Sequence, residues 1–491
     1  MSTRADLGSL EASGLIEIAA LQPELEYLFR HALVQEAAYA SLLKQDRRAL
    51  HRAAAETILA LHPDRERALA PVIGMHLEQA GDADRAAPYF VIAGQQALER
   101  FANKEATRFF RHGVALAGDS QKDLRIQAAI GSAKAGWTFA TFDEDVEQLE
   151  KVLSDSAESD QRLVAEAYFW LALLRRQRGE VPDTSPELKR AIDRSVEVGL
   201  ELNDPAAAAL PRALMGSYAA FTGKLRDGER EMRDALDVIV KTRDPVAIAM
   251  VSDFLALAQT RLGDFDAAAE TIARSRTFAG EGDEIARIDV DIAQASLHLE
   301  RGELDEASER AHLCATRAEE LGAYACVVVS NIMFGAASLA QEDATAAKAP
   351  LERGKELCHL TGMAPMRTLL NALLGSTRAR LGDIPGGVAS WDEALDNARG
   401  MNDRYGEAQT LWGRGRTYAL QAHPDWPAAL ADLDRATELF EGMEAKPSLA
   451  RALHDRARVL HGMGRGTEAD EAERRSTQLG RELGLKDMPF A

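Results

Sequence analysis

One spacing of small and bulky side chains recurs along most of this chain. In its clearest copy, Ala256 is followed by Ala268 twelve positions later, by Ile272 four positions after that and by Ser275 three positions further on. A Gly-Asp pair at 263–264 interrupts the helical pattern between the two alanines, which predicts a turn between two helices. The same spacing begins again at Gly74, Gly216, Ala295, Gly335 and Gly375, in a stretched form at Gly415 and in a form without the bulky residue at Ala457.

This spacing describes a helical hairpin that has to stack on its neighbours. Two antiparallel helices approach closely where small side chains face each other, and a bulky side chain one turn later fills the space between hairpins. A single hairpin of this kind leaves an apolar face uncovered, so several copies must pack in a row. The low aromatic content of 6% also favours close-packed helices over sheets. We therefore predict an all-α solenoid.

The register resembles the tetratricopeptide repeat, with which it shares the small–small–bulky–small spacing and the turn in the middle of the hairpin. The standard repeat has about 34 residues. Here the turn positions lie 39 to 41 residues apart, at Gly223, Gly263, Gly302, Glu342, Gly382, His423 and Gly464. The helices should therefore be longer, as in the sensor arms of large bacterial signalling proteins. The resemblance implies a right-handed tetratricopeptide-like α-solenoid.

Residues 1–62 follow a different pattern. Residues 7–13 predict a short helix ended by Gly14. Residues 15–18 and 25–29 predict two strands around a turn at Gln22-Pro23. Two amphipathic helices are predicted at 31–43 and 47–61. His31, Gln35 and Tyr39 share one face of the first of these helices, and we expect them to dock it onto the first repeat.

The run FRHALVQEAAY at 29–39, followed by Leu42-Leu43, Arg47-Arg48 and His51, resembles a junction in bacterial multidomain signal-transduction ATPases. This family includes members with a class III adenylate/guanylate cyclase domain. In the family, the preceding strands form the wing of a winged-helix domain, and helical repeats follow. The resemblance implies a small winged-helix remnant that contains a β-hairpin. The catalytic modules of the family lie upstream of this junction, so the resemblance implies no catalytic residues in this chain.

We predict five segments along the chain. Pro182 and Pro186 interrupt the helical pattern and indicate a joint between two arrays. The segments are a winged-helix remnant with junction helices at 1–62, a first helical-repeat array at 63–180, a joint and connecting helix at 181–204, the regular array at 205–484 and a frayed tail at 485–491.

The charge balance excludes some classes of partner. The 491-residue chain has 58 basic and 78 acidic residues and a net charge of −20, the opposite of the excess that phosphate-binding proteins carry. We therefore expect no nucleic-acid binding and no membrane binding. Three cysteines are too few for a disulfide framework. No signal-peptide pattern and no run of eighteen apolar residues occurs, which predicts a soluble cytoplasmic protein.

Motifs for chemistry are missing from the sequence. A phosphate-binding loop needs Gly-x-x-x-x-Gly-Lys-Ser/Thr, and no such run occurs. Neither Cys-x-x-Cys nor His-Glu-x-x-His is present, and Cys314 occupies a small-residue position of its hairpin, which predicts a packing role. Asp289 and Asp291 are expected on an exposed acidic helix face, without an acid–base task. We predict no catalytic, cofactor-binding or metal-binding residues, and a protein that is not an enzyme.

The first helix of each hairpin should line the concave side of the solenoid. The positions one and four residues after the small residue give a strip of small and apolar side chains, with two arginines one position further on. This strip predicts a groove that accepts a protein or peptide, as an apolar helix or an extended segment. The predicted partner-binding residues are Leu257, Thr260, Arg261, Ser296, Leu299, Leu339 and Arg380. The alternative is a tightly wound coil in which these residues pack on one another.

Taken together, the patterns favour a non-catalytic protein–protein interaction scaffold, or a sensor arm of a bacterial signalling ATPase or cyclase system. Two other interpretations stay open. In one, the chain is a regulatory subunit or fragment of an adenylate cyclase or ATP-binding protein whose catalytic domains lie upstream. In the other, it is a sensor that holds a small-molecule inducer inside the coil.

Overall fold

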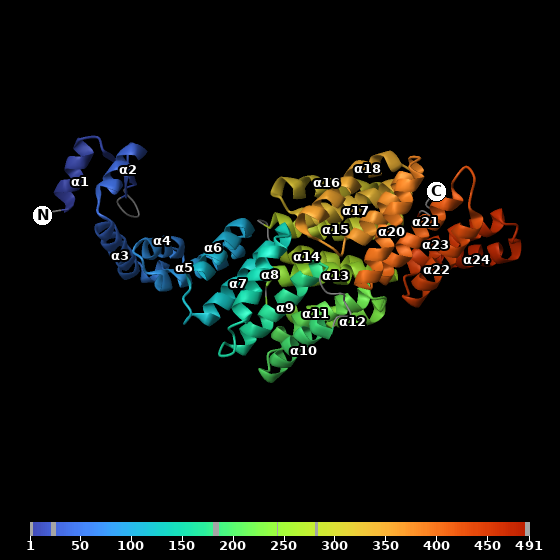
Figure 1. Ribbon diagram of the computed structural model, residues 1–491, viewed down its shortest axis with the longest axis horizontal. Coiled ribbons are helices and arrows are strands. Elements are labelled where there is room, and N and C mark those ends of the chain that lie inside the picture. Colours follow the sequence, from blue (N-terminus) through green and yellow to red (C-terminus); the bar gives the residue numbers. More distant parts are fainter. Residues whose placement is uncertain (1–2, 21–25, 180–185, 243, 280–282, 487–491) are drawn as a thin grey trace.

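Helical hairpins form most of the molecule, and a small mixed module precedes them (Figure 1). The computed structural model describes residues 3–20, 26–179, 186–242, 244–279 and 283–486. The module consists of α1 (Thr3–Ala12), β1 (Ile16–Ala20), β2 (Glu26–Phe29), α2 (Ala32–Ser41) and α3 (Lys44–Leu61).

The helices that follow pair in sequence order. The first group is η1 (Pro63–Arg65), α4 (Ala70–Gln79), α5 (Ala83–Glu99), α6 (Asn103–Leu116), α7 (Lys122–Gly136), η2 (Trp137–Phe139), α8 (Phe142–Leu153), α9 (Gln161–Gln177) and α10 (Pro186–Glu201). The regular hairpins are α11 (Pro205–Phe221) with α12 (Leu225–Ile239), α13 (Pro245–Leu262) with α14 (Phe265–Phe278), α15 (Glu284–Arg301) with α16 (Leu304–Leu321), α17 (Tyr324–Ala340) with α18 (Ala344–Thr361), α19 (Arg367–Arg380) with α20 (Ile384–Met401), α21 (Arg404–Ala419) with α22 (Trp426–Gly442), and α23 (Lys446–Gly462) with α24 (Gly466–Leu483).

The amino-terminal module stands apart from the main body (Figure 1). Its strands pair antiparallel, with Ile16 opposite Phe29. The expected helix, hairpin and two helices are present, which confirms the prediction for this region, although the turn at Gln22-Pro23 lies outside the described residues. Helix α2 buries none of its residues, and Leu33 is 78% exposed.

Three ring side chains, of Tyr39, His51 and His76, connect the amino-terminal module to the first repeat. The Tyr39 hydroxyl lies 3.0 Å from Nε2 of His51, and Nδ1 of His51 lies 2.8 Å from Nδ1 of His76 in α4. Tyr39 thus takes part in the predicted docking, whereas His31 and Gln35 stay exposed at the surface. Burial, together with the charge of His51, lowers the pKa of His76, so this contact favours the neutral form of the His76 imidazole.

The predicted small-residue register holds the hairpins together. In the clearest copy, Ala256, Ala268 and Ile272 are all buried. Between α11 and α12 the two backbones touch, because a Cβ atom on Gly228 would lie 2.3 Å from the Gly216 carbonyl oxygen. These contacts confirm the predicted fold, a mostly helical tetratricopeptide-like solenoid with an amino-terminal β-hairpin.

The solenoid winds tightly enough for successive turns of the coil to touch. The Ala364 amide donates to the Gln177 carbonyl oxygen at 2.7 Å, and the Arg451 guanidinium donates to the Glu300 carboxylate at 2.6 Å. Partners of this kind lie roughly four to five hairpins apart in the chain, whereas an open solenoid connects each repeat only to its neighbours. Helix α23 accordingly packs against both α13 and α15.

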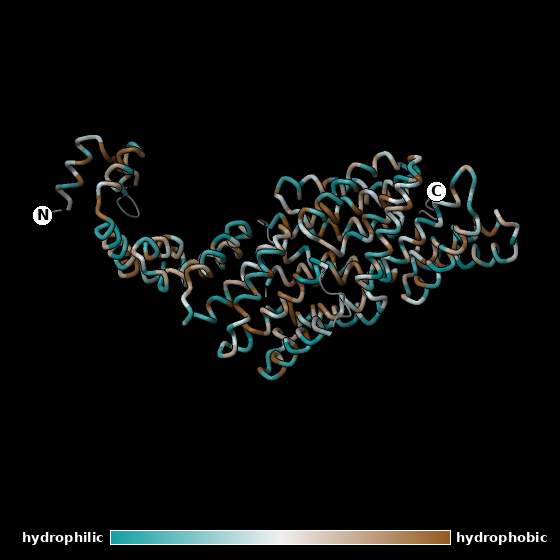
Figure 2. The backbone as a smooth tube through the Cα atoms, viewed as in Figure 1, coloured by the Kyte–Doolittle hydropathy of each residue, from teal (hydrophilic) through white to brown (hydrophobic). Residues whose placement is uncertain are grey.

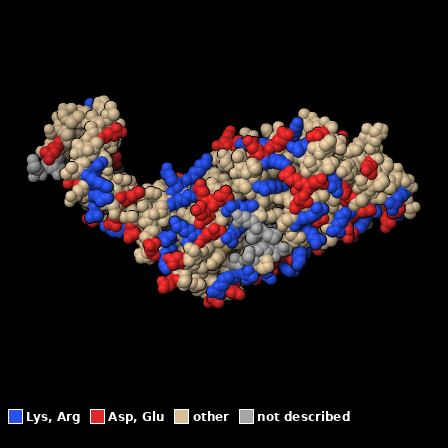
Figure 3. Space-filling model, in the orientation of Figure 1, with Lys and Arg blue, Asp and Glu red and all other residues tan. Residues whose placement is uncertain are grey.

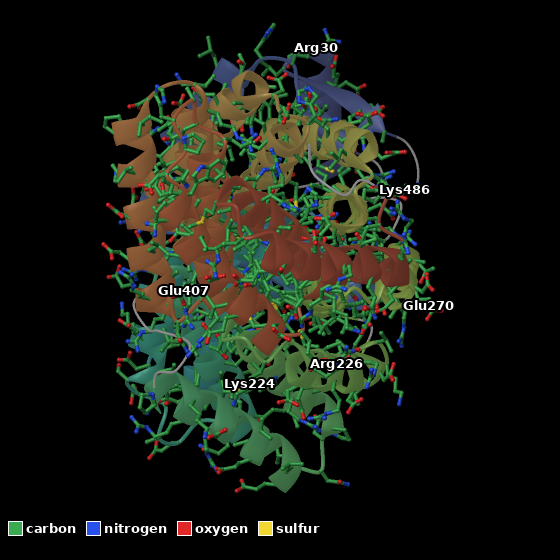
Figure 4. All side chains as sticks on the ribbon, turned by 90° about the vertical axis from the view of Figure 1, so that its right-hand side faces the viewer. Arg30, Lys224, Arg226, Glu270, Glu407 and Lys486 are labelled. Carbon is green, nitrogen blue, oxygen red and sulfur yellow. The ribbon has the colours of Figure 1, made fainter. Side chains whose placement is uncertain are left out.

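Further contacts of this kind close the carboxy-terminal end. Arg226 lies 3.7 Å from Glu444, and the Lys486 amide donates to the Arg301 carbonyl oxygen at 2.9 Å. Figure 4 looks onto this end and shows Lys486 near its edge and Arg226 in its lower part. The predicted frayed tail is therefore wrong at its start, because Leu485 also packs on the core while Lys486 is held by two partners, Arg301 and Glu303. Residues 487–491 lie outside the described part.

The outer surface is polar and mixed in charge. Hydrophobic segments gather where helices of the body face one another (Figure 2). Basic and acidic side chains are interspersed over the face shown in Figure 3. Within the described ranges, no helix is both long enough and apolar enough to cross a membrane.

Candidate binding channel

The first helices of five successive hairpins surround an open space inside the coil. Each of α13, α15, α17, α19 and α21 presents residues three or four positions apart, which lie on one helical face. A cavity of about 250 Å³ adjoins a second cavity of about 150 Å³, and we call the two together the inner channel. Both cavities share the lining residues Leu257, Arg261, Ser296, Ile332, Met333, Leu369 and Tyr405.

Six of the seven predicted partner-binding residues line this channel: Leu257, Arg261, Ser296, Leu299, Leu339 and Arg380. The coil is thus wound tightly, as the alternative interpretation expected, and still encloses open space. Partner binding at these residues stays a prediction.

Thr260 is the predicted residue that lies outside the channel lining, since it is 1% exposed. The equivalent residues of other hairpins show the reason. A Cβ atom on Gly228 would lie 3.0 Å from the Cβ of Ala220, and one on Gly387 would lie 3.0 Å from the Cβ of Ala379. In these hairpins the position four residues after the small residue turns toward the second helix, whereas Leu299 and Leu339, at the same position of two other hairpins, line the channel.

One end of the channel is acidic, which the sequence analysis did not predict. Asp253 in α13 and Asp289 in α15 line the larger cavity. The Cys326 thiol donates to Oδ1 of Asp289 at 3.1 Å, and Asp253 has neither a hydrogen bond nor an ion pair with any described residue. Both carboxylates are surrounded by protein and face the open space. Both lie on the same helical faces as the predicted residues, because Asp253 lies one helical turn before Leu257 and Asp289 lies two turns before Ser296.

Burial dominates the protonation of these two groups. It raises the pKa of Asp289 to about 6, because the charged carboxylate loses hydration. Burial also raises the pKa of Asp253 well above its usual value, and the charge of Asp289 adds to that rise. The expectation that Asp289 is exposed was wrong. Residues two positions apart lie on opposite faces of a helix, and Asp291 faces the second helices of the hairpins, where Arg276 in α14 and Arg310 in α16 each donate to it at 3.0 Å.

The channel becomes basic further along. Arg261, at the end of α13, is 6% exposed, and its guanidinium lies 3.9 Å from the ring centroid of Tyr405 and 5.6 Å from that of Phe221. Arg380, at the end of α19, donates to the Leu339 carbonyl oxygen at 2.8 Å, but its Nε has no acceptor among the described residues. Burial first, and then the charge of Arg416, lower the pKa of Arg380 to about 10.

Beside Arg261 lies a buried ion pair between two residues of the protein, Arg451 and Glu300. Arg451 is 3% exposed and donates to the Glu300 carboxylate at 2.6 Å and to the Glu300 carbonyl oxygen at 2.6 Å. The Tyr405 hydroxyl donates to the other oxygen of the same carboxylate at 3.3 Å. Glu300 is therefore committed to joining two turns of the coil.

The three cysteines are free and buried. Burial raises the pKa of Cys314 and of Cys358 to about 12, and that of Cys326 well above its usual value. The thiols stay protonated at neutral pH, and a protonated thiol is a poor nucleophile. The predicted packing role of Cys314 agrees with its burial against α15, where its thiol lies 4.0 Å from the Ile288 carbonyl oxygen. The described residues contain no cluster of three or more His, Cys, Asp or Glu side chains that could hold a metal ion.

Sequence comparison gives a single short match among curated proteins at a significant level. No family model matches the chain. A stretch of 105 residues is 32% identical to an uncharacterized protein of Rhizobium meliloti (strain 1021) and covers 21% of this chain. The matched stretch covers 10% of the length of that relative.

Several solved structures resemble the helical arrangement. The APC/C hetero-tetramer Cut9–Hcn1 aligns with a TM-score of 0.49 and 14% identity over 92% of this chain and 90% of that chain. The signal transduction ATPase with numerous domains and a tetratricopeptide repeat sensor from Pyrococcus horikoshii aligns with a TM-score of 0.48 and 15% identity, over 82% of this chain and 58% of that chain. The Rap conjugation gene regulator of plasmid pLS20 in complex with the Phr* peptide aligns with a TM-score of 0.48 and 13% identity, over 73% of this chain and 96% of that chain. These likenesses concern the fold alone.

Proposed function

We propose that this chain is a non-catalytic sensor or scaffold arm of a bacterial signalling system, and that it binds an extended peptide segment in the inner channel. The observation that carries the proposal is the channel itself, an apolar space inside the coil with charged side chains at its two ends. Pockets of this composition bind ligands by burying apolar surface and orient them through a few polar groups.

The dimensions of the channel favour an extended segment over a helix. Its two cavities, of about 250 and 150 Å³, lie near or below the lower end of the usual range for ligand pockets. A helix with its side chains is about 10 Å across, whereas an extended chain is narrower.

The amino-terminal module fits the same proposal. Its β-hairpin and flanking helices agree with a winged-helix remnant, and it stands away from the body (Figure 1). We propose that it connects the sensor arm to other parts of a signalling assembly. The interpretation as a regulatory piece of a cyclase or ATPase system places the same binding function in a larger machine.

The channel proposal can be tested with a defined pool of unmodified pentapeptides and native mass spectrometry. We expect the purified protein to retain peptides, and the double variant Leu257→Glu with Ala336→Glu to retain at least about tenfold less, because two added carboxylates would occupy and charge the apolar section. Both side chains line the channel and are partly exposed to it, so helicity should be kept.

A matched control changes exposed leucines on the outer helices. Leu313 in α16 and Leu360 in α18 are 46% and 69% exposed. The double variant Leu313→Glu with Leu360→Glu should bind like the unmodified protein. Equal retention by the channel variant and the control, or no retention by the unmodified protein, would contradict the proposed function.

A further inference from the structure

The inner channel carries opposite charges at separate positions along one helix. Asp253 and Arg261 both lie on α13 and both line the larger cavity. They are eight residues apart, so their positions are separated by about 12 Å along the helix axis. Asp289 adds a second carboxylate near Asp253, and Arg380 lies beyond Arg261 in the second cavity.

Among the described residues, the two charged groups on α13 have no partner in a hydrogen bond or an ion pair. Arg261 is almost fully buried, yet its guanidinium lies against the rings of Tyr405 and Phe221, and no described residue accepts a hydrogen bond from it. Asp253 likewise receives no hydrogen bond from a described residue. Buried charges are normally paired and hydrogen-bonded, since an isolated one is expensive to remove from water.

The neighbouring pair shows how this protein satisfies a buried charge that has a structural role. Arg451 donates to one carboxylate oxygen of Glu300 and to its carbonyl oxygen. The Tyr405 hydroxyl donates to the other carboxylate oxygen. The favourable position of a cation at a helix carboxy terminus accounts for the sign of Arg261. The helix dipole does not explain why the guanidinium of Arg261 faces a cavity in which no described residue accepts a hydrogen bond from it.

Between the charged positions the lining is apolar. Phe254, Leu257, Ile292, Ile332 and Met333 all line the space around this section. A ligand that matches the whole channel therefore needs a cation at one end, apolar groups in the middle and an anion at the other end.

We propose that the channel takes a short linear peptide with both termini free, its α-ammonium group at Asp253 and Asp289 and its carboxylate between Arg261 and Arg380. This inference rests on the proposed function and adds the length, direction and end groups of the ligand. An extended chain advances about 3.3–3.6 Å per residue, so a span of about 12 Å corresponds to about three to five residues. Apolar side chains would occupy the middle of the channel, and the two termini would form charge-assisted hydrogen bonds at its ends.

The test uses the same pentapeptide pool in four forms: both termini free, amino terminus acetylated, carboxy terminus amidated, and both capped. In competition by native mass spectrometry, we expect the full-length protein to prefer the free form over either singly capped form by about tenfold or more, the effect of losing a hydrogen bond to a charged group. The doubly capped form should be the weakest.

Two substitutions test which terminus of the peptide binds at which end of the channel. Asp253→Asn should remove the preference for a free amino terminus and keep the preference for a free carboxylate. Arg261→Gln should do the reverse. Asp266→Asn, which removes a fully exposed carboxylate of α14, is the matched control and should preserve both preferences.

The outcomes separate the two proposals. If no form binds the unmodified protein, the proposed function fails. If all forms bind equally and the channel variant still loses them, the proposed function stands and the end-group assignment is wrong. A preference that survives Asp253→Asn and Arg261→Gln unchanged would also overturn the assignment, as would a free α-amino acid that displaces the peptides at equal concentration, because such a ligand cannot span both ends.

Discussion

Asp253 and Asp289 oppose folding at neutral pH. Each is surrounded by protein with its charge poorly compensated, and the pKa of each is raised, to about 6 for Asp289. The folded state therefore binds a proton more strongly than the unfolded state, whose carboxyl groups titrate near 4. Stability from this source is complete below the unfolded pKa and is lost as pH rises through the folded pKa.

We predict a pH effect that the variant Asp289→Asn reduces. Between about pH 4 and pH 6, the unmodified protein should lose several degrees of melting temperature relative to the variant, because deprotonating Asp289 leaves a charge that is buried away from water and lies near the carboxylate of Asp283. Differential scanning fluorimetry across this range measures the difference between the two proteins. Asp266→Asn should follow the unmodified protein, and a variant curve parallel to that of the unmodified protein would contradict the prediction.

At the residue scale, the sequence could predict part of the channel. The repeat spacing identified Leu257 and Ser296, one position after the small residue, and Arg261, five positions after it, and all three line the channel. It misplaced Thr260, since a shift of one residue rotates a side chain by about 100° around the helix. It missed Asp289 because a nearby carboxylate, Asp291, made the segment look like an acidic, exposed helix face, whereas Asp291 is paired with Arg276 and Arg310.

At the scale of helices, close backbone contact sets the geometry of each hairpin. A Cβ atom on Gly228 would lie 2.3 Å from the Gly216 carbonyl oxygen and 2.9 Å from the Ala220 nitrogen. Both obstacles are backbone atoms, so relief requires the whole of α12 to move away from α11. The sequence predicted these pairings well, because small residues at a fixed spacing have few other uses in a helix.

We predict that Gly228→Ala destabilises the protein by about 1–3 kcal/mol, the range for overpacked contacts. Gly400→Ala is the matched control, since it lies in helix α20 with no atom within 4 Å of the added methyl group. That change should be neutral or stabilising by up to about 1 kcal/mol, because alanine favours helix more than glycine does. Urea denaturation followed by circular dichroism compares the two, and equal midpoints would refute a backbone contact at Gly228.

At the scale of the whole molecule, contacts between turns of the coil distinguish this protein from an open solenoid. The bond from Ala364 to Gln177, the Arg451–Glu300 pair and the Lys486 contacts join parts of the chain that are far apart in sequence. Local spacing cannot predict them, because they depend on how small rotations between hairpins add up over four or five repeats.

We predict that Arg451→Met destabilises α15 as well as the helices next to α23 in sequence. Removing one partner of a buried ion pair leaves the other charge uncompensated, at a cost of about 3–5 kcal/mol. Hydrogen exchange should therefore become faster in Leu299 and Glu300, which accept bonds from Arg451. Arg458→Met, an exposed site on the same helix, is the control. Faster exchange confined to α22–α24 would indicate a coil whose turns act independently.

The contacts between turns also bear on how a bound molecule comes and goes. A segment lying inside a coil that is tied across its turns cannot arrive sideways, as it could on an open concave surface. It has to thread in from one end or wait until adjacent turns separate, and both routes lower the encounter rate below that of a preformed open site. Slow arrival with equally slow departure gives a long-lived complex, so such a receptor would register sustained signals and ignore brief ones.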